Sequence, residues 1–438
     1  MPVGDFDFTG PSPWRAIRQE RMRTLLPEAM KAANVDAWVT LVRENANDPL
    51  ALHVGGENAG ALSAILFLRE GERTRSVILA GFGEAIALRE LGVHDSVVVY
   101  TAESGGPLGG VAERLTRAKS QRIAINSGNL AMADGLSASQ RAALERALGP
   151  ELTARLVSSG ELVSAWLSKK LPSEVAIMRR AAALTAQLER EAYASVVPGR
   201  TKDSDLARFL KLRMRELGVE DGWSPAQNPS VNSGPDRGHS HASERVIQHG
   251  DVIQIDFGIK VHGVWGTDIQ RFAYVLRPGE TRAPADVQTK WEAAVRGNRA
   301  AFNAMRPGVL GSAVDSAQRV VMQRDRSASV PWGTGHSVGY WAHDVGPGLN
   351  RSTRRPLEAG MTFAFDGFHA WTLPGGDGTW GNGSKTISVE EMVVITPTGA
   401  EYLVPPQEEL ILISPAGAAR PQGDSRPARV SPRRTGGR

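Results

Sequence analysis

Residues 251–276 read DVIQIDFGIKVHGVWGTDIQRFAYVL, and this stretch decides the expected fold. Two apolar, β-branched runs on either side of a turn at His262 and Gly263 predict two neighbouring strands. Each predicted strand carries one acid in apolar company, Asp256 and Asp268. A buried pair of carboxylates is costly unless a positive group lies between them, and a metal ion is the obvious candidate. Taken singly, each acid is better explained as a turn residue at a strand end.

A second strand pair with its own acids follows about a hundred residues later. MTFAFDG (361–367) and TISVEEMVVIT (386–396) have the composition of buried strands. Asp366 ends the first of these runs and Glu390 lies inside the second. The repetition makes the metal interpretation stronger than it is for either acid alone.

Two histidines lie in the segment between the strand pairs. PWGTGHSVGYWAHDVGPGLN (331–350) contains His336 and His343 among glycines and prolines, which predicts a loop or short strands. Four carboxylates and one imidazole form a hard ligand set that suits manganese, cobalt, iron or zinc. The four negative charges balance two divalent ions, and two close ions can activate water for hydrolysis.

The bulk composition limits the class of protein. The 438 residues suffice for two or three domains, and 41% hydrophobic with 22% charged residues is ordinary for a soluble globular chain. Without cysteine, neither disulfides nor thiolate metal ligands are available. No apolar run approaches a membrane span, and no secretory pattern follows the N-terminal charges. We therefore expect a cytoplasmic protein without membrane contact.

The net charge of +4 is concentrated at the C-terminus. Residues 415–438 contain six arginines and one aspartate, so the first 414 residues carry a net charge of −1. This Pro/Gly/Arg-rich tail is expected to be disordered, and a nearly neutral body does not indicate nucleic-acid binding.

The order of predicted elements indicates two folded regions. Residues 1–165 alternate short apolar strands with amphipathic helices, which predicts an α/β domain. Residues 171–414 give helices, a strand pair, two further helices at about 284–305 and 310–323, and the second strand pair. This order suggests an internal duplication around one shared site.

Four segments resemble the metal-binding motifs of the creatinase, prolidase and aminopeptidase P family, and they occur in that family's order. The segments are IDFG…TDIQR, GTGHSVG…HDVGP, LEAGM and VEEMVVIT. The region before them is similar to the family's N-terminal domain. The resemblance implies an α/β N-terminal domain followed by an α+β pita-bread catalytic domain, and a homodimer.

Matched position by position, the resemblance also implies roles for individual residues. It implies metal ligands at Asp256, Asp268, His336, Asp366 and Glu390. His239 and His343 would hold the substrate carbonyl and its developing oxyanion, with His241 as the alternative to His239. A metal-bridging hydroxide would attack the carbonyl, and Asp366 would also handle the proton. Two divalent ions are implied, manganese foremost, with cobalt, iron or zinc as alternatives.

Three features depart from the family pattern. Asp366 stands where glutamate is usual, and aspartate is shorter by about 1.5 Å. The spacing from Asp256 to Asp268 is one residue longer than expected, which requires a bulge near Gly266 if the second acid is to keep its face. Trp332 stands where aminopeptidase P-like enzymes have a substrate-facing histidine, so it would narrow the pocket.

The sequence therefore predicts a dinuclear hydrolase of the Xaa-Pro peptidase type, which removes an N-terminal residue from a peptide or splits a dipeptide. The departures leave two alternatives open. One is a relative with changed chemistry, a creatinase-like or lyase-like enzyme acting on a small molecule. The other is a non-catalytic relative that binds a partner. We expect tryptophans such as Trp332 either to wall a pocket or to pack in the core.

Overall fold

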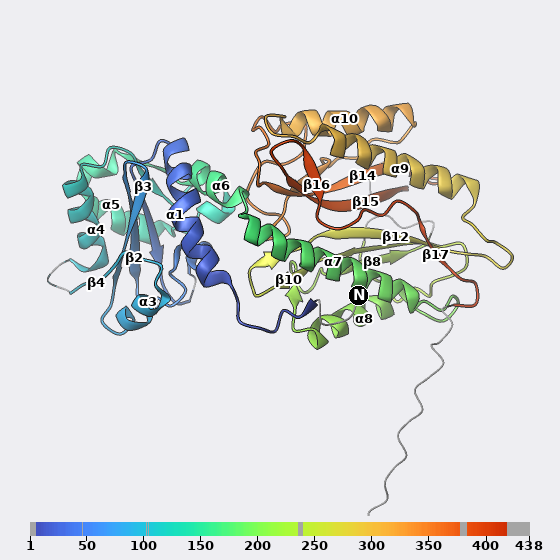
Figure 1. The fold of residues 1–438 in the computed structure, drawn as a ribbon, viewed down its shortest axis with the longest axis horizontal. Coiled ribbons are helices and arrows are strands. Elements are labelled where there is room, and N and C mark those ends of the chain that lie inside the picture. Colours follow the sequence, from blue (N-terminus) through green and yellow to red (C-terminus); the bar gives the residue numbers. More distant parts are fainter. Residues whose placement is uncertain are drawn as a thin grey trace, which may run out of the picture.

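The chain folds into two lobes, which Figure 1 shows side by side, with the N-terminal lobe in blue. The computed structural model describes most of the chain, namely residues 6–45, 47–101, 103, 105–234, 240–376 and 383–417. The expected tail falls almost entirely outside these residues. Within them, no helix has the length and apolar character that crossing a membrane requires.

The N-terminal lobe is built on a six-stranded mixed sheet in the order β4-β3-β2-β1-β5-β6. Its strands are β1 (Ala37–Val42), β2 (Ser63–Glu70), β3 (Arg73–Ala80), β4 (Ser96–Val99), β5 (Ile123–Ile125) and β6 (Leu156–Ser158). Its helices are α1 (Trp14–Ala32), α2 (Ala51–Val54), α3 (Ala85–Leu91), α4 (Gly106–Ala118), α5 (Ala138–Thr153) and α6 (Gly160–Ser168), with a short 3-10 turn at Ala131–Ala133.

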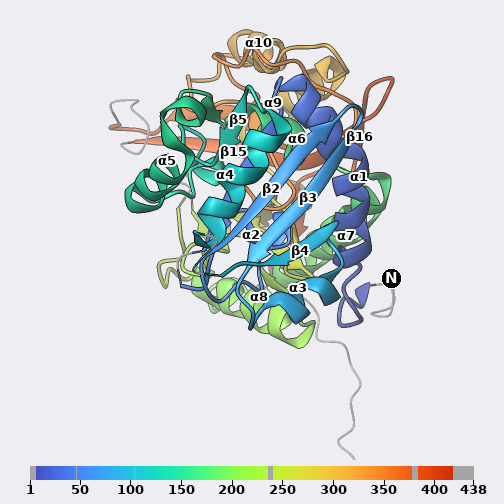
Figure 2. The same cartoon turned by 90° about the vertical axis from the view of Figure 1, so that its left-hand side faces the viewer.

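Alternating side chains give this sheet two buried faces. Val39 and Leu41 of β1 pack in one apolar cluster with residues of α4 and α5, whereas Trp38 packs in another with residues of α1 and α6. The alternation follows from the two-residue period of a strand. Figure 2 shows the helices on both sides of the sheet, which confirms the expected α/β region.

The C-terminal lobe is built on a larger, mainly antiparallel sheet in the order β13-β14-β15-β12-β9-β8, with β16 beside β15 and β17 beside β12. Its strands are β8 (Ser230–Ser233), β9 (Val252–Phe257), β12 (Ile269–Val275), β13 (Gly335–Ser337), β14 (Thr362–Thr372), β15 (Ser384–Ile395), β16 (Ala400–Tyr402) and β17 (Ile411–Ile413). A small second sheet contains β7 (Glu220–Asp221), β10 (Ile259–Val261) and β11 (Trp265–Gly266).

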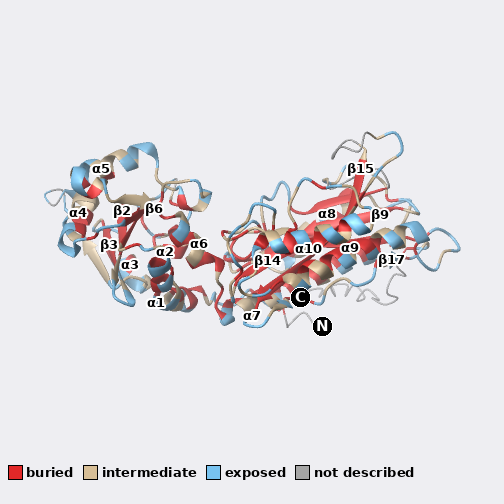
Figure 3. Cartoon of the chain, turned by 90° about the horizontal axis from the view of Figure 1, so that it is seen from above, coloured by how far each residue is buried: buried red, intermediate tan, exposed pale blue. Residues whose placement is uncertain are grey.

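Two pairs of helices accompany the large sheet. They are α7 (Pro172–Ala194), α8 (Asp203–Glu216), α9 (Ala285–Ala304) and α10 (Gly311–Arg324). In Figure 1 α9 and α10 lie on one side of the strands and α7 and α8 on the other. Figure 3 shows that the strands between them are buried almost throughout. The expected order of helices and strand pairs is confirmed. It buries most side chains of the central strands (Figure 3), where a lone charge is costly.

The two lobes meet where α6 ends and α7 begins. Pro172 occupies the first turn of α7, and the carboxylate of Glu174 accepts a hydrogen bond from the backbone N–H of Leu171 (2.9 Å), which satisfies one free donor of the helix start. Trp14 of α1 packs edge-on against Trp265 of β11, with ring centroids 5.8 Å apart. The division into domains at 1–165 and 171–414 stays a prediction.

Candidate metal centre

The strand register places three of the predicted ligands in one row across the large sheet. Asp256 of β9 lies opposite Gln270 of β12, and Gln270 in turn lies opposite Glu390 of β15. Glu390 lies opposite Asp366 of β14. Directly opposed residues of antiparallel strands point to the same face. The row therefore brings together acids that are more than a hundred residues apart in the chain.

The other two predicted ligands belong to the same face. Asp268 precedes Gln270 by two residues, and residues two apart on an extended strand share a face. His336 lies opposite Ala364, which precedes Asp366 by two residues. All five side chains therefore converge, and each of them lines one cavity of about 480 Å³.

The predicted bulge near Gly266 is wrong. β9 and β12 pair up to Phe257 opposite Ile269, and β10 and β11 continue with Lys260 opposite Gly266. Two residues on each strand lie between these pairs, so the register is unchanged. The turn at 262–264 connects the strands, and its first two residues have left-handed φ values of 52° and 67°. Side chains of both strands therefore keep their alternation between the two faces of the sheet, because neither strand contains an extra residue.

Three ligands are spaced as a single ion requires. Nε2 of His336 lies 3.7 Å from Oδ2 of Asp268 and 3.6 Å from Oε1 of Glu390. One ligand atom from each residue lies within 4.8 Å of the others. An ion about 2.0 to 2.2 Å from each ligand atom fits such separations.

The electrostatics of the centre require a counter-charge. Burial raises the pKa values of Asp256, Asp268 and Asp366 well above the usual range, and the negative charge of Glu390 raises them further. Burial opposes the charged form of His336, but its hydrogen bond to Glu390 and that residue's charge raise the pKa overall. Oε2 of Glu390 is buried and has no hydrogen-bond partner among the described residues. An oxygen-rich set with an unsatisfied buried oxygen fits divalent cations.

The predicted substrate-binding histidines have different outcomes. The ring of His343 stacks on that of His336, with centroids 4.2 Å apart, and it lines the cavity. Burial lowers the pKa of His343, and the charge of His336 lowers it further. His239 lies outside the described residues. The alternative, His241, is exposed and lies 3.2 Å from Oγ of Ser230, which is opposite Asp256 in the sheet.

Comparison with known proteins agrees with this geometry. A family model described as "Metallopeptidase family M24" matches residues 176–397, which include all five predicted ligands. The chain belongs to this family.

Relatives of this M24 chain are peptidases by name. The Mycobacterium tuberculosis protein "Probable dipeptidase PepE" is 28% identical over 249 residues, which is 56% of this chain and 60% of that protein. The Pyrococcus furiosus "Xaa-Pro dipeptidase" is 24% identical over 55% of this chain and 64% of that protein. The matched part thus spans about three-fifths of the length of these curated relatives.

The solved structures extend the similarity to both lobes. An Xaa-Pro dipeptidase from Bacillus anthracis has a TM-score of 0.67 at 20% identity and covers 91% of this chain and all of its own. Dipeptidase PepE from Mycobacterium ulcerans has a TM-score of 0.67 at 24% identity, over 92% of this chain and 100% of its own. The expected pita-bread fold behind an α/β domain is confirmed.

One residue at the M24 centre was missed by sequence analysis. Gln270 stands between Asp256 and Glu390 in the row, and its Nε2 donates toward Oδ1 of Asp366 over 3.4 Å. Its Oε1 accepts hydrogen bonds from Nε2 of Gln254 (2.7 Å) and from Oγ of Ser388 (3.0 Å), so the NH2 end of the amide faces Asp366. The signal was its place two residues after Asp268, which gives it the same face.

Trp332 lines the cavity of this M24 chain, as expected for a residue that walls the pocket. Its ring packs edge-on against Phe368, with centroids 5.7 Å apart, and its carbonyl oxygen accepts a hydrogen bond from Nη2 of Arg319 (2.6 Å). Phe368 of β14 therefore contacts the indole, and Arg319 of α10 holds the backbone of the same residue.

Proposed function

We propose that the chain is a hydrolase of the Xaa-Pro peptidase type that depends on two divalent ions, and that it removes an N-terminal residue from a peptide or splits a dipeptide. The observation that carries this proposal is the convergence of four acids and one histidine on one face of one sheet, around a cavity of about 480 Å³. The names of the relatives support the substrate class.

The metal ligands in this proposal are Asp256, Asp268, His336, Asp366 and Glu390. Two ions held there would polarise the scissile carbonyl and lower the pKa of a water molecule to near neutrality. No Lys or Arg side chain lines the cavity among the described residues, so neither residue type neutralises the acids from within the cavity.

His343 and Asp366 have separate tasks in the proposed reaction. A neutral imidazole has one N–H to donate, and burial holds the pKa of His343 below its usual value, so His343 suits binding of the substrate carbonyl oxygen. Asp366 is a carboxylate at the end of the row, where it can accept the proton of the attacking water and pass it to the leaving amine. His239 is proposed to hold the substrate with His343.

Three further properties are proposed. Manganese as the native metal, with cobalt, iron or zinc as alternatives, follows from the oxygen-rich ligand set and the family resemblance. A homodimer follows from the family resemblance alone, and a cytoplasmic location from the composition. The substrate partner is a peptide or another small molecule.

The test is cleavage of a panel of Xaa-Pro dipeptides, Xaa-Pro tripeptides and dipeptides without proline by the manganese-loaded protein, with metal content measured on the same sample. We expect about two ions per chain and cleavage that a chelator abolishes. Asp268→Ala is the control and should remove both.

Two other outcomes favour the alternatives. Full metal content without cleavage would indicate changed chemistry on a small molecule, which the shorter Asp366 and the indole of Trp332 in the pocket wall favour. Fewer than about one ion per chain would indicate a binding protein rather than a two-metal enzyme.

A further inference from the structure

Glu174 is a buried carboxylate at the junction of the lobes, and its two oxygens face different parts of the molecule. Oε2 accepts hydrogen bonds from Nη1 of Arg21 (2.6 Å) and from the backbone N–H of Leu171 (2.9 Å). Oε1 accepts hydrogen bonds from the hydroxyl of Tyr340 (2.6 Å) and from Nε1 of Trp265 (3.2 Å). One carboxylate thus joins the N-terminal lobe to two segments of the C-terminal lobe.

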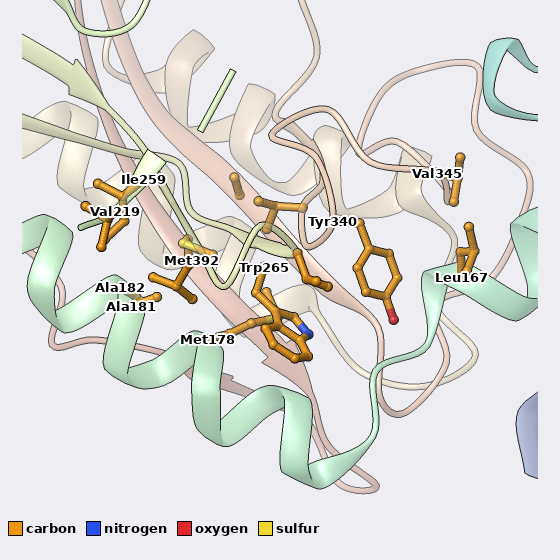
Figure 4. Packing of buried hydrophobic residues seen from close by; sticks show 14 of the residues in the cluster. Leu167, Met178, Ala181, Ala182, Val219, Ile259, Trp265, Tyr340, Val345 and Met392 are labelled. Atoms are coloured by element: carbon orange, nitrogen blue, oxygen red, sulfur yellow. The ribbon is translucent and has the colours of Figure 1, made fainter. Parts of the chain in front are cut away.

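The two partners of Oε1 lie on the segments that carry the metal centre. Trp265 belongs to β11 and precedes Asp268 by three residues. Tyr340 lies in the loop between His336 and His343. Figure 4 shows Trp265 and Tyr340 close together near the first turn of α7. A displacement of Glu174 would therefore remove a hydrogen-bond acceptor from both segments at once.

A second ion pair fixes the same loop next to His343. Nζ of Lys170 lies 3.0 Å from Oδ2 of Asp344, and both side chains are almost fully buried, with 1% and 0% exposed. The Asp344 carboxylate also accepts a hydrogen bond from the backbone N–H of Tyr340 (2.9 Å). The loop from 338 to 345 is thus closed on itself and tied to the linker between α6 and α7.

Arg21 supplies the positive charge for this junction from α1 of the N-terminal lobe. The side chains of Arg21 and Glu174 are both 0% exposed. Nη2 and Nη1 of Arg21 also donate to the carbonyl oxygens of Trp166 (2.6 Å) and Lys169 (2.8 Å). Removing Arg21 leaves the buried carboxylate of Glu174 uncompensated, so Glu174 must move toward water or take up a proton.

The N-terminal lobe also encloses Tyr340 by packing. The ring of His53 in α2 lies 4.6 Å from that of Tyr340, and the ring of Trp14 lies 6.1 Å from it. The guanidinium of Arg21 lies 5.3 Å from the same ring centroid. Loop 338–345 therefore packs on one side against the N-terminal lobe, and one of the residues that it contacts there, Arg21, is charged.

We propose that Arg21 and Glu174 are positioning residues, through which the N-terminal lobe of the same chain holds loop 338–345 and strand β11 so that His343 and Asp268 keep their places at the metal centre. The catalytic meaning of this arrangement rests on the proposed function. A second part of the proposal is independent of that function: the order of loop 338–345 depends on the positive charge that Arg21 of α1 contributes.

The experiment compares Arg21→Met with a matched control, Arg18→Met, in the manganese-loaded full chain. Arg18 is also on α1 and 2% exposed, but it pairs with Glu57 (2.6 Å) and Leu52 O (2.7 Å) inside the N-terminal lobe. We expect Arg21→Met to lower kcat on the order of 10- to 100-fold, the scale of a reacting group displaced by about 1 Å. KM should stay unchanged, and so should metal content with manganese in excess, where a displaced Asp268 lowers metal affinity without emptying the site. Arg18→Met should keep the kcat of the parent.

Tyr340→Phe is the milder variant, which removes one hydrogen bond to Glu174 and keeps the ring. It should also lower kcat, by a smaller factor than Arg21→Met does. If Arg21→Met does not fold, Tyr340→Phe tests the proposal in its place. In a His343→Ala background, Arg21→Met should lower kcat less than it does in the parent, because the group it positions is already absent. Equal kcat in Arg21→Met and Arg18→Met, or an unchanged kcat in Tyr340→Phe, would overturn the proposal.

Hydrogen exchange separates this proposal from the proposed function. Backbone amides of 338–345 should exchange at least tenfold faster in Arg21→Met and at the parental rate in Arg18→Met. If the parent cleaves no peptide but this contrast is found, the proposed function fails and the positioning of the loop stands. If the parent cleaves peptides and both variants exchange alike, the positioning proposal fails alone.

Discussion

Asp268→Asn should stabilise the metal-free protein and remove most of the stabilisation that metal binding gives. Asp268 is 5% exposed, and its carboxylate belongs both to the triad with His336 and Glu390 and to a hydrogen bond with Asp256. Its pKa is raised by burial and then by the charges of Glu390, Asp256 and Asp366. Replacing it with the nearly isosteric asparagine removes a charge and keeps the packing.

The sign follows from the raised pKa values of the buried acids. A carboxyl whose folded-state pKa is raised gives its full stabilisation below the unfolded pKa of about 3.9, and loses it as the pH rises through the folded pKa. Asp256, Asp268 and Asp366 all have such raised pKa values, caused by burial and then by Glu390. The metal-free protein should therefore become less stable from about pH 4 upward.

The size of the effect follows from the spacing of the charges. Nε2 of His336 lies 3.7 Å from Asp268 and 3.6 Å from Glu390, so the acids are close neighbours. Two like charges about 4 Å apart repel by about 4 kcal/mol at an effective dielectric constant of 20. Metal-free Asp268→Asn should thus be about 2 to 4 kcal/mol more stable than the metal-free parent at pH 8. Manganese at 100 times Kd should stabilise the parent by about 2.7 kcal/mol and the variant hardly at all.

The assay is thermal unfolding at pH 5 and pH 8 in chelator and in manganese, with metal content measured in parallel. A gain of 2 to 4 kcal/mol corresponds to a Tm rise of roughly 5 to 15 °C for a lobe of this size. Asp203→Asn is the control, because Asp203 is equally buried but accepts hydrogen bonds from the N–H groups of Ser243 (3.0 Å) and Arg245 (3.2 Å), so it should lower Tm in both conditions. A metal-free Asp268→Asn that is less stable than the metal-free parent at pH 8 would refute the reasoning.

Three further substitutions test other parts of the centre. Gln270→Ala removes the donor facing Asp366 and should weaken manganese binding about 10- to 100-fold by calorimetry, with the fold retained. Gly367→Ala should lower the free energy of unfolding in urea by about 1 to 3 kcal/mol, because a Cβ there would overlap the carbonyl oxygen of Ala294 in α9. Trp332→His should raise kcat/KM for Xaa-Pro tripeptides on the order of fivefold, since it adds one hydrogen-bond partner and removes bulk; an unchanged kcat/KM would show that the indole does not contact substrate.

The sequence predicted which four acids and which histidine the fold brings together, because each lies in a local pattern. A single acid inside an apolar strand is conspicuous, and four such acids with a Gly-rich histidine segment point to one site. The strands around Asp256 and Glu390, and the helices from 285 to 304 and from 311 to 324, follow the same local periodicity. The α/β nature of the first lobe was likewise readable from alternating strands and helices.

The residues that the sequence did not reveal act through partners that are distant in the chain. Glu174 has an ordinary place in the first turn of a helix, and Arg21 reads as one of several charges on an amphipathic stretch. Their significance comes from their contact with each other, although 153 residues separate them in the chain. In this buried ion pair each side chain balances the charge of the other. Gln270 is similar in part. Its place two residues after Asp268 indicates its face, but its contacts follow only from its neighbours on β9 and β15.

The spacing between Asp256 and Asp268 shows why counting residues between ligands was misleading. In an antiparallel hairpin, the face of a side chain is set by its position along the ladder, counted from the paired residues. A residue added within one strand shifts every later position and reverses its face. A residue added to the turn shifts the partner strand and its ladder together, so opposed residues stay opposed. Here Phe257 pairs with Ile269, and the same register continues to the turn at 262–264. The longer spacing therefore leaves Asp268 on the face of Asp256, and the turn is free to vary in length without cost to the metal centre.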